Sequence, residues 1–237
     1  MIGDDDVAIE IEGTNGAAAI GRVIDAGTRA KNLVGKRVLV GPIDPCGECD
    51  VCRRGGAAVC PTARKRTAPL ASPVIAAARW LVTLGEPDGV DVPSPAGAVV
   101  AGDLAIAYTL YARTGVGPRD PVVVVGDDPI ARHLAAVLRA KGITPATSGT
   151  ADEIRAAFAE QGLGQKPWRV IATSSVDRAA ELCGPRSTLT VLAPVASLPG
   201  ELVAREVTVI AVAGAHPDLV TEIAALVAKG ELTLPVD

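Results

Sequence analysis

Apolar and charged residues alternate in the first part of the chain, which is the pattern of half-buried β-strands. Residues 7–13 (VAIEIEG) show this period of two. Two further strands are predicted over residues 20–27 and 36–42, separated by Gly, Asn and Thr residues that are typical of turns. The first 45 residues are therefore predicted to be β-rich.

The pattern changes in the second half to uninterrupted apolar strands that alternate with helices. Four valines at residues 122–125 are followed by a tight turn and by an amphipathic helix that ends at Gly142. Parallel sheets covered by helices on both faces have such continuous apolar strands. Strands are predicted at 169–175, 187–194 and 206–214, and helices at 95–115, 151–162, 176–184 and 217–231.

These two patterns predict an α/β chain with two domains. Residues 1–117 form a β-rich domain, and residues 118–237 form a doubly wound, Rossmann-like parallel sheet. The chain has 237 residues and is 49% hydrophobic, so it can bury a sizeable core. Aromatic residues make up only 2%, so this core must consist mainly of Ala, Val, Leu and Ile.

Charge and composition exclude several classes of partner. A formal net charge of -4 and few aromatic residues argue against a nucleic-acid surface. The short basic run at residues 63–67 (ARKRT) is interpreted as a solvated loop. No apolar stretch is long enough for a membrane span, and the acidic start differs from a secretory signal. We therefore expect a cytoplasmic protein.

The densest chemical motif is a cluster of cysteines within residues 45–61 (PCGECDVCRRGGAAVCP). Four thiolates complete a tetrahedral zinc shell and leave no open position for a substrate, so such a site is structural. Free or disulfide-bonded cysteines are the alternative, which a reducing compartment disfavours. A fifth cysteine, Cys183, is interpreted as a small buried apolar residue. The predicted zinc ligands are Cys46, Cys49, Cys52 and Cys60.

With this spacing, the cysteine lobe resembles the structural-zinc lobe of the medium-chain zinc alcohol dehydrogenases. The flanking segments at residues 21–52, 77–84 and 98–126 are similar to the same family, and residues 226–237 resemble the end of its nucleotide-binding domain. The resemblance implies a shortened GroES-like first domain, a Rossmann-like second domain, and an oxidoreductase lineage. Because the chain ends at Asp237, it also implies a shallow cleft between them.

The catalytic zinc ligands that the resemblance would imply are not found in the sequence. The segment after the first strand, which would carry a Cys ligand, is shorter here by roughly two to four dozen residues. A Gly-His-Glu motif would fall on Gly16, Ala17 and Ala18, and alanine cannot bind a metal. The later ligand position falls on Gly102, with Asp103 one residue away as a helix cap, a stray carboxylate or a remnant ligand.

The turn after the valine strand departs from the dinucleotide-binding pattern. That pattern is Gly-x-Gly-x-x-Gly, and its second glycine lets the backbone approach the pyrophosphate. Here Asp128 stands at that position, next to Asp127, and both carboxylates would repel a phosphate. The stretch after the next strand, residues 143–150, has no acid for a ribose. If NAD(P) binds, the contact residues are expected to be Gly126, Pro129 and Ile130.

Three hypotheses remain open at this point, and the sequence leaves open whether the chain is an enzyme. In the first, the chain keeps the structural zinc and has lost its active centre. In the second, it is a zinc-independent NAD(P)H oxidoreductase, with Tyr108, Tyr111 or Asp103 relaying a proton, although both tyrosines fit a helix core. In the third, the residual cleft binds an acyl-CoA or a nucleotide. Neither His133 nor His216 has a plausible ligand pair.

A homodimer is the expected assembly. In the resembled family the nucleotide-binding domains pair edge to edge through their last strand. Residues 206–214 (EVTVIAVAG) would be that strand here. It is long and apolar, and an exposed strand of this kind favours pairing with a second chain.

Overall fold

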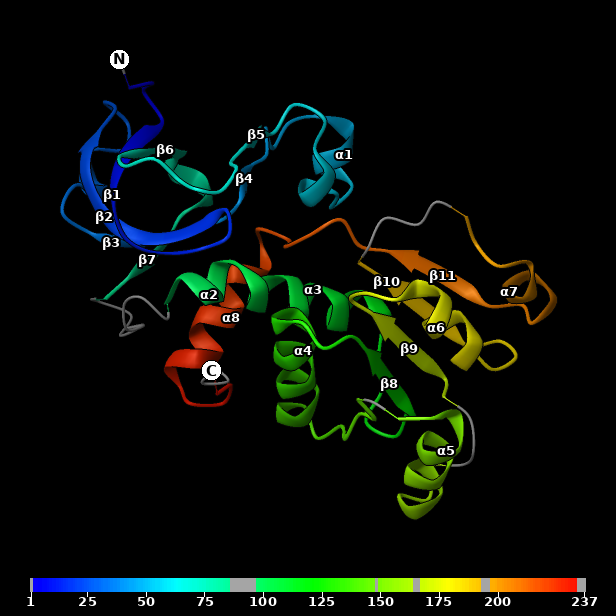
Figure 1. The fold of residues 1–237 in the computed structure, drawn as a ribbon. Helices are drawn as coiled ribbons and strands as arrows, with labels where there is room; N and C mark the ends of the chain where they lie inside the picture. Colours follow the sequence, from blue (N-terminus) through cyan, green and yellow to red (C-terminus); the bar gives the residue numbers. More distant parts are fainter. Residues whose placement is uncertain (1, 86–96, 148, 164–166, 193–196, 234–237) are drawn as a thin grey trace. The chain divides into compact units, whose positions relative to one another are not determined.

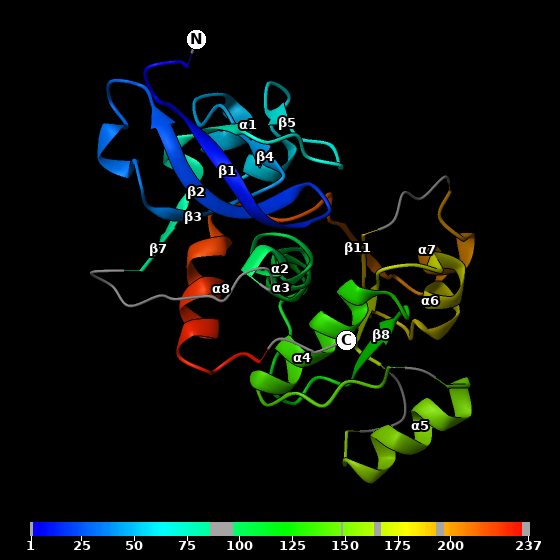
Figure 2. The ribbon, with the colours of Figure 1, turned by 60° about the vertical axis from the view of Figure 1, so that its left-hand side comes forward.

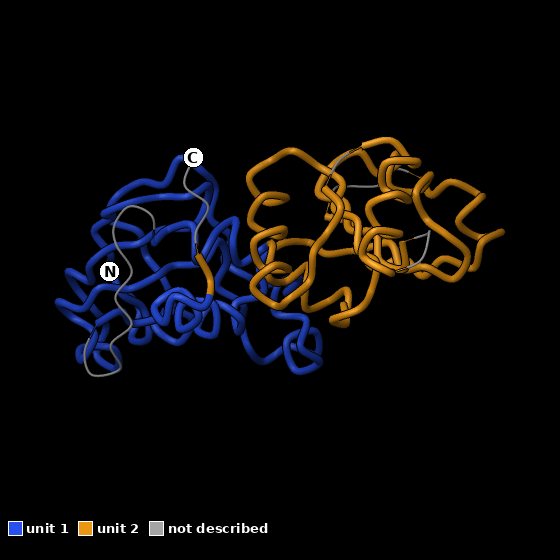
Figure 3. Tube along the Cα trace, turned by 90° about the horizontal axis from the view of Figure 1, so that it is seen from below, with its two compact units in different colours: residues 1–106, 215–231 blue, residues 107–214, 232–237 orange. Residues whose placement is uncertain are grey.

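Two compact units make up the chain, and Figure 3 colours them separately. The structure is a computed structural model and describes residues 2–85, 97–147, 149–163, 167–192 and 197–233. Unit 1 comprises residues 1–106 and 215–231, and unit 2 comprises residues 107–214 and 232–237. Residues 215–231 thus belong to the same unit as the N-terminal half of the chain. The linear boundary between residues 117 and 118 stays a prediction.

An antiparallel sheet of five strands in the order β6-β1-β2-β3-β7 forms the body of unit 1 (Figures 1 and 2). Alternate side chains of β1, β2, β3 and β6 meet in one core that is rich in valine. The three predicted N-terminal strands are therefore present. The bounds are β1 Asp6–Asn15, β2 Ala18–Ala26, β3 Arg37–Val40, β6 Val74–Ala77 and β7 Val82–Leu84.

The cysteine lobe projects from this sheet between β3 and β6. Its neck is a two-stranded sheet of β4 (Ile43–Asp44) and β5 (Arg64–Lys65). Between these strands lie the short helix α1 (Asp50–Arg53) and the 3-10 helix η2 (Ala57–Val59). Outside the lobe, two further 3-10 helices are η1 (Lys31–Leu33), before β3, and η3 (Ala78–Trp80), after β6. The lobe thus has little regular structure of its own to hold it together.

Unit 2 contains a parallel sheet of four strands in the order β11-β10-β9-β8. On the free side of β8, Val123 forms one parallel bridge with Ala146. The doubly wound dinucleotide sheet has the order 3-2-1-4-5-6. Strands β8, β9, β10 and β11 therefore match strands 1, 4, 5 and 6 of that order, and Ala146 lies in the place of strand 2. The bounds are β8 Val122–Val125, β9 Arg169–Ala172, β10 Thr188–Val191 and β11 Thr208–Ala211.

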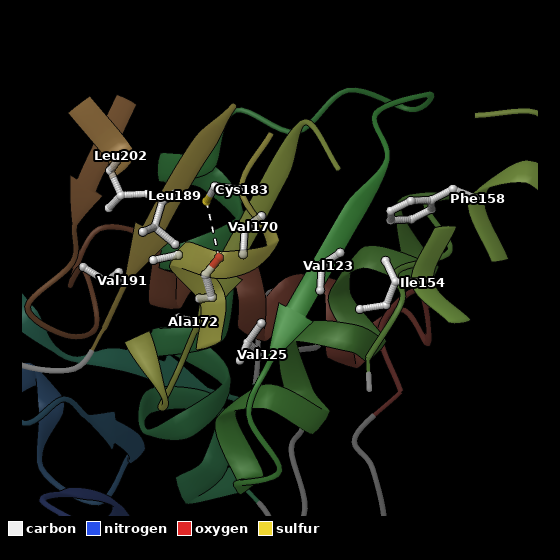
Figure 4. Close-up of a cluster of buried hydrophobic side chains, with 12 residues drawn as sticks. Val123, Val125, Ile154, Phe158, Val170, Ala172, Cys183, Leu189, Val191 and Leu202 are labelled. Atoms are coloured by element: carbon white, nitrogen blue, oxygen red, sulfur yellow. Dashed lines mark hydrogen bonds between the residues drawn. The ribbon is translucent and has the colours of Figure 1, made fainter. Parts of the chain in front are cut away.

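Helices cover both faces of this parallel sheet, as predicted. On one face, Val123, Val170 and Leu189 pack with Ile154 and Phe158 in the core that Figure 4 shows. On the other face, the side chain of Thr190 meets Thr114 in a buried hydrogen bond of 2.9 Å. The helices are α2 Gly97–Ala101, α3 Asp103–Thr114, α4 Pro129–Ala140, α5 Ala151–Glu160, α6 Val176–Leu182, α7 Gly200–Ala204 and α8 Leu219–Ala228.

The structure differs from the sequence prediction at three elements. The last strand is shorter than predicted: β11 covers Thr208–Ala211, and Glu206 has a φ of +53° that is incompatible with a strand. Helix α7 was not predicted, because it has only five residues. The helical stretch predicted from residue 95 begins outside the described residues, and a break at Gly102 divides it into α2 and α3.

Within the described ranges, no helix is both long enough and apolar enough to span a membrane.

Candidate metal centre and dinucleotide turn

The four cysteines of the lobe converge on one point. Their Sγ atoms all lie within 4.8 Å of one another, and Cys49 is also the N-cap of α1. The distance from Cys46 Sγ is 3.6 Å to Cys60 Sγ and 4.0 Å to Cys52 Sγ, and Cys49 Sγ lies 3.9 Å from Cys60 Sγ. A tetrahedron with metal–sulfur bonds of about 2.3 Å has edges of about 3.8 Å. The cysteines are free, and their spacing fits one metal ion.

Hydrogen bonds around the cysteines favour the thiolate form that a metal requires. The Thr62 hydroxyl, followed by the backbone amides of Glu48 and Cys49, lowers the pKa of Cys46 to about 5. The pKa of Cys60 is also lowered, first by the backbone amide of Cys46. Burial instead raises the pKa of Cys52 to about 12. A bound cation would favour the deprotonated form of all four sulfur atoms.

Side chains from outside the lobe hold its entry strand. The indole Nε1 of Trp80 donates to the Pro45 carbonyl at 2.7 Å. The Arg79 guanidinium donates to the carbonyl oxygens of Pro45 and Cys46. Because η3 places both residues beside Cys46, hydrogen bonds from outside the lobe hold the backbone of Cys46 in position.

The basic run at residues 63–67 is only partly the solvated loop that was predicted. The side chain of Arg66 is 6% exposed and lies 2.5 Å from Asp44 Oδ2, whose side chain is 5% exposed. Arg66 also donates to the Gly41 carbonyl at 2.8 Å. Arg64 pairs with Asp6 at 2.7 Å and is partly exposed. The prediction was wrong for Arg66, because a carboxylate 22 residues earlier in the chain compensates its burial.

The resemblance would place catalytic zinc ligands at residues 16–18 and 102–103. These two regions lie close together, and they form a hairpin turn and the start of α3. A two-residue turn, Gly16 and Ala17, joins β1 directly to β2, with Asn15 paired opposite Ala18. Gly16 has a φ of +58°, which suits the first position of a type II′ hairpin turn. No side chain of Gly16, Ala17 or Ala18 can coordinate a metal.

Asn15 connects this hairpin to the start of α3. Its Oδ1 accepts from the backbone amide of Asp103 at 2.8 Å, and its Nδ2 donates to Asp103 Oδ2 at 3.1 Å. The Asn15 amide therefore caps α3 from another element and engages the carboxylate at the same time. A Cβ on Gly102 would lie 2.0 Å from Asn15 Oδ1, so only glycine leaves room for this contact. Asp103 thus has a specific structural partner.

The turn after β8 is filled by the chain's own carboxylate. Asp128 is the N-cap of α4: its Oδ1 accepts from the Ala131 amide at 3.0 Å. Its Oδ2 accepts from the Thr173 hydroxyl at 2.5 Å. Gly126 has a φ of +147°, and a Cβ there would lie 2.0 Å from Thr173 Oγ1. At the N-terminus of α4, where this fold type binds pyrophosphate, an internal anion already satisfies the helix.

Near this turn, the carboxyl ends of β8 and β9 enclose a small crevice of about 290 Å³. Asp127, Thr147, Ser174 and Arg178 line it with polar groups. This is the topological switch point at which open α/β sheets bind ligands. Of the three predicted contact residues, Gly126 lines the crevice, Pro129 is the first residue of α4, and Ile130 follows it in the helix.

Other residues singled out in the sequence have structural surroundings. Cys183 is 3% exposed and bonds the Ala179 carbonyl, so it is the buried apolar residue that was predicted. Tyr108 is 4% exposed and stacks edge-on with Tyr111. His133 lies buried in α4. Among the described residues, the only group of three or more His, Cys, Asp or Glu side chains that could hold a metal is the cysteine cluster.

Sequence reasoning missed Asn15, Thr173, Arg79 and Trp80. Each acts through a partner in a distant segment: Asn15 and Thr173 bond to residues 88 and 45 positions away. A single polar side chain carries no periodic signal, so the sequence could not show these contacts. The break at Gly102 between two helical segments was the one local signal of a close approach.

The comparisons with known proteins support the class that these observations define, a GroES-like unit followed by a Rossmann-like unit. Residues 4–86 match the family model of the alcohol dehydrogenase GroES-like domain. The chain as a whole has the fold of the medium-chain zinc-type alcohol dehydrogenases. The N-terminal domain thus matches the alcohol dehydrogenase GroES-like family and the whole chain shares this fold, as the resemblance seen in the sequence implied. No curated protein matches the chain.

Solved structures show the same fold at low sequence identity. An alcohol dehydrogenase of Escherichia coli CFT073 in complex with NADH has a TM-score of 0.81 and 16% identity, covering 98% of this chain and 83% of that one. The alcohol dehydrogenase TADH from Thermus sp. ATN1 has a TM-score of 0.80 and 15% identity, over 98% and 84%. A putative zinc-binding dehydrogenase of Sinorhizobium meliloti 1021 bound to NADP has a TM-score of 0.73 and 18% identity, over 98% and 84%.

Proposed function

We propose that this chain is a zinc-binding, alcohol-dehydrogenase-like protein that keeps the structural zinc and lacks the catalytic zinc ligands, so that it is not a functional alcohol dehydrogenase. The observation that carries the proposal is the contact of Asn15 with Gly102 and Asp103. This contact lies where residues 16–18 and 102–103 meet, the two regions in which the family resemblance would place catalytic ligands. The polar groups of Asn15 and Asp103 are engaged there in hydrogen bonds with each other. A catalytic zinc needs three protein ligands and an open position.

In the cysteine lobe, by contrast, the residues fit a metal. Cys46, Cys49, Cys52 and Cys60 would hold one zinc ion through their thiolates. When bound, the ion would supply a fixed centre for a segment with little regular structure, and the full shell would leave no position for a substrate. The surrounding amides and Thr62 orient the sulfur atoms. This site therefore supports structure.

A second candidate is a zinc-independent NAD(P)H oxidoreductase of the same superfamily. The crevice at the switch point favours it, because Ser174 and Arg178 offer polar contacts to a nucleotide. Two solved structures of this fold are described as bound to NADH and NADP. Against it stands Asp128, whose carboxylate occupies the place of the pyrophosphate and would repel it.

Titration with NADH and NADPH separates the two candidates. We expect no saturable binding of either nucleotide below about 1 mM, measured by fluorescence and calorimetry. Asp128→Ser should then gain measurable binding, because serine still caps α4 but removes the charge and shortens the side chain. Asp152→Ser, at an exposed acid in the first turn of α5, is the matched control. Sub-millimolar binding by the unaltered protein would exclude the non-binding proposal.

We also propose that the protein forms a homodimer through the edge strand near residues 206–214. Strand β11 ends the described sheet order, and its Thr208 and Ala211 are exposed. Thr208 and Val212 donate their amides to β10, so the alternating amides of Val209 and Ala211 point to the free side. An unpaired row of this kind is a template for a second strand.

Removal of one backbone amide on the free side of β11 tests this interface. Ala211→Pro should convert the dimer to a monomer while leaving the bonds to β10 intact, because the Ala211 amide faces away from β10. Light scattering coupled to size exclusion gives the mass in solution, and the unfolding temperature shows whether the fold survives. A monomeric unaltered protein, or an Ala211→Pro dimer of unchanged affinity, would contradict this interface.

A further inference from the structure

His216 forms a hydrogen bond between two distant parts of unit 1. Its Nε2 lies 2.7 Å from the carbonyl oxygen of Gly55 in the cysteine lobe. A carbonyl can only accept, so Nε2 carries the proton in this contact. The side chain is only 18% exposed, and its Nδ1 lies 3.5 Å from Asp218 Oδ2. The imidazole therefore joins segments 161 residues apart in a mostly buried setting.

The Gly55 carbonyl is positioned by the fold of the lobe around the cysteines. The Gly55 amide donates to the carbonyl of the ligand Cys52 at 3.0 Å, and the neighbouring Gly56 amide donates to Val51 at 2.8 Å. Gly55 has a φ of +78°, so the turn that aims its carbonyl requires glycine. Cys52 and Cys60 flank this turn on either side. A metal that holds both sulfur atoms would thereby hold the carbonyl in place.

At its other end, His216 begins the segment that leads into α8. The chain enters unit 1 again at Ala215, and the Leu219 amide donates to the His216 carbonyl at 3.1 Å in the first turn. Helix α8 then buries Val220, Ile223 and Ala224 and packs against α2 (Figure 2). The backbone of His216 thus starts α8 while its side chain contacts the lobe.

We propose that His216 couples metal loading of the cysteine lobe to the order of the segment at residues 215–228. This rests on the proposed metal site. A loaded lobe presents the Gly55 carbonyl in the geometry that binds His216, and that bond restrains the start of α8. Coupling between two sites is reciprocal, so ordering of residues 215–228 must in turn raise the affinity of the cysteine lobe for the metal. His216 is thus a positioning residue for the metal site, although it is not a ligand.

Two readouts test the coupling without any enzymatic activity. Zinc release to a chromogenic chelator should be roughly two- to tenfold faster in His216→Ala, the range that one hydrogen bond accounts for. Amide hydrogen exchange, followed by mass spectrometry, should rise over residues 215–228 when zinc is removed from the unaltered protein. In His216→Ala this exchange should already be raised in the loaded protein, and zinc removal should add little.

Matched variants distinguish the coupling from a general loss of stability. His216→Gln keeps an amide donor near the position of Nε2 and should recover much of the slow release. Asp218→Asn leaves the Gly55 contact in place and should behave like the unaltered protein. If zinc binds but its removal leaves exchange over residues 215–228 unchanged, the coupling is wrong and the metal site stands. If the purified protein binds no zinc at all, the metal site itself is wrong.

Discussion

Cys60→Ala is expected to lower bound zinc from about one ion per chain to near zero. Cys60 is the buried member of the cluster, and its Sγ lies within 4 Å of the Sγ atoms of Cys46 and Cys49. Removing it opens the shell and leaves three sulfur atoms without the fourth that closes the tetrahedron. Because metal binding supplies folding free energy, the variant should also unfold at a lower temperature. Elemental analysis and thermal denaturation measure the two effects.

Cys183→Ala is the matched control for this loss. Cys183 is equally buried, but it lies in the apolar core of unit 2. Burial there raises the pKa of its thiol, which disfavours the thiolate that a metal needs. Its removal should leave the zinc content at one ion per chain. Full zinc content in Cys60→Ala would contradict the four-cysteine site. Two zinc ions per unaltered chain would contradict the proposal that no catalytic zinc is held.

Much of the fold could be predicted because periodic patterns carry it. Alternation in residues 7–13 gave β1, and the run of four valines gave β8 with α4 after it. The cysteine spacing predicted the candidate metal site, because its four cysteines all lie within one short segment. These features depend on neighbours in the sequence, and a single chain is enough to show them.

The rest depended on contacts between distant residues. The resemblance pointed to the regions of residues 16–18 and 102–103, but it could not show that Asn15 binds Asp103 there. Asp128 was predicted to repel a phosphate, and the structure adds that it caps α4 and accepts from Thr173. Asn15 and Asp128 follow the same physical rule. The first backbone amides of a helix have no acceptor within the helix, and a side chain elsewhere in the protein supplies one.

This rule has the same consequence at the N-termini of α3 and α4. At each, a helix end is satisfied by an internal oxygen atom, from Asn15 at α3 and from Asp128 at α4. A ligand that bound there would have to displace a hydrogen bond that already stabilises the fold. Binding of a pyrophosphate at α4 would therefore require removal of the internal side chain, which is why Asp128→Ser is the informative variant for the nucleotide site.

The buried ion pair at the neck of the lobe leads to the largest expected change in stability. Asp44→Ala should lower the free energy of unfolding by about 3–5 kcal/mol, because it leaves the Arg66 guanidinium buried without its carboxylate. The same carboxylate accepts from the Ala77 amide at 3.0 Å, so β6 also loses a bond. Denaturant unfolding monitored by circular dichroism measures the change.

An exposed pair in the same unit is the control for Asp44→Ala. Asp25 and Lys31 lie 3.3 Å apart, and both side chains are 61% exposed. Asp25→Ala should therefore change the free energy of unfolding by no more than about 1 kcal/mol. The double variant Asp44→Asn with Arg66→Met should recover much of the loss, since it removes both charges from the buried site. Equal effects of Asp44→Ala and Asp25→Ala would show that the neck is solvated, and Arg66 would then have to leave its buried position.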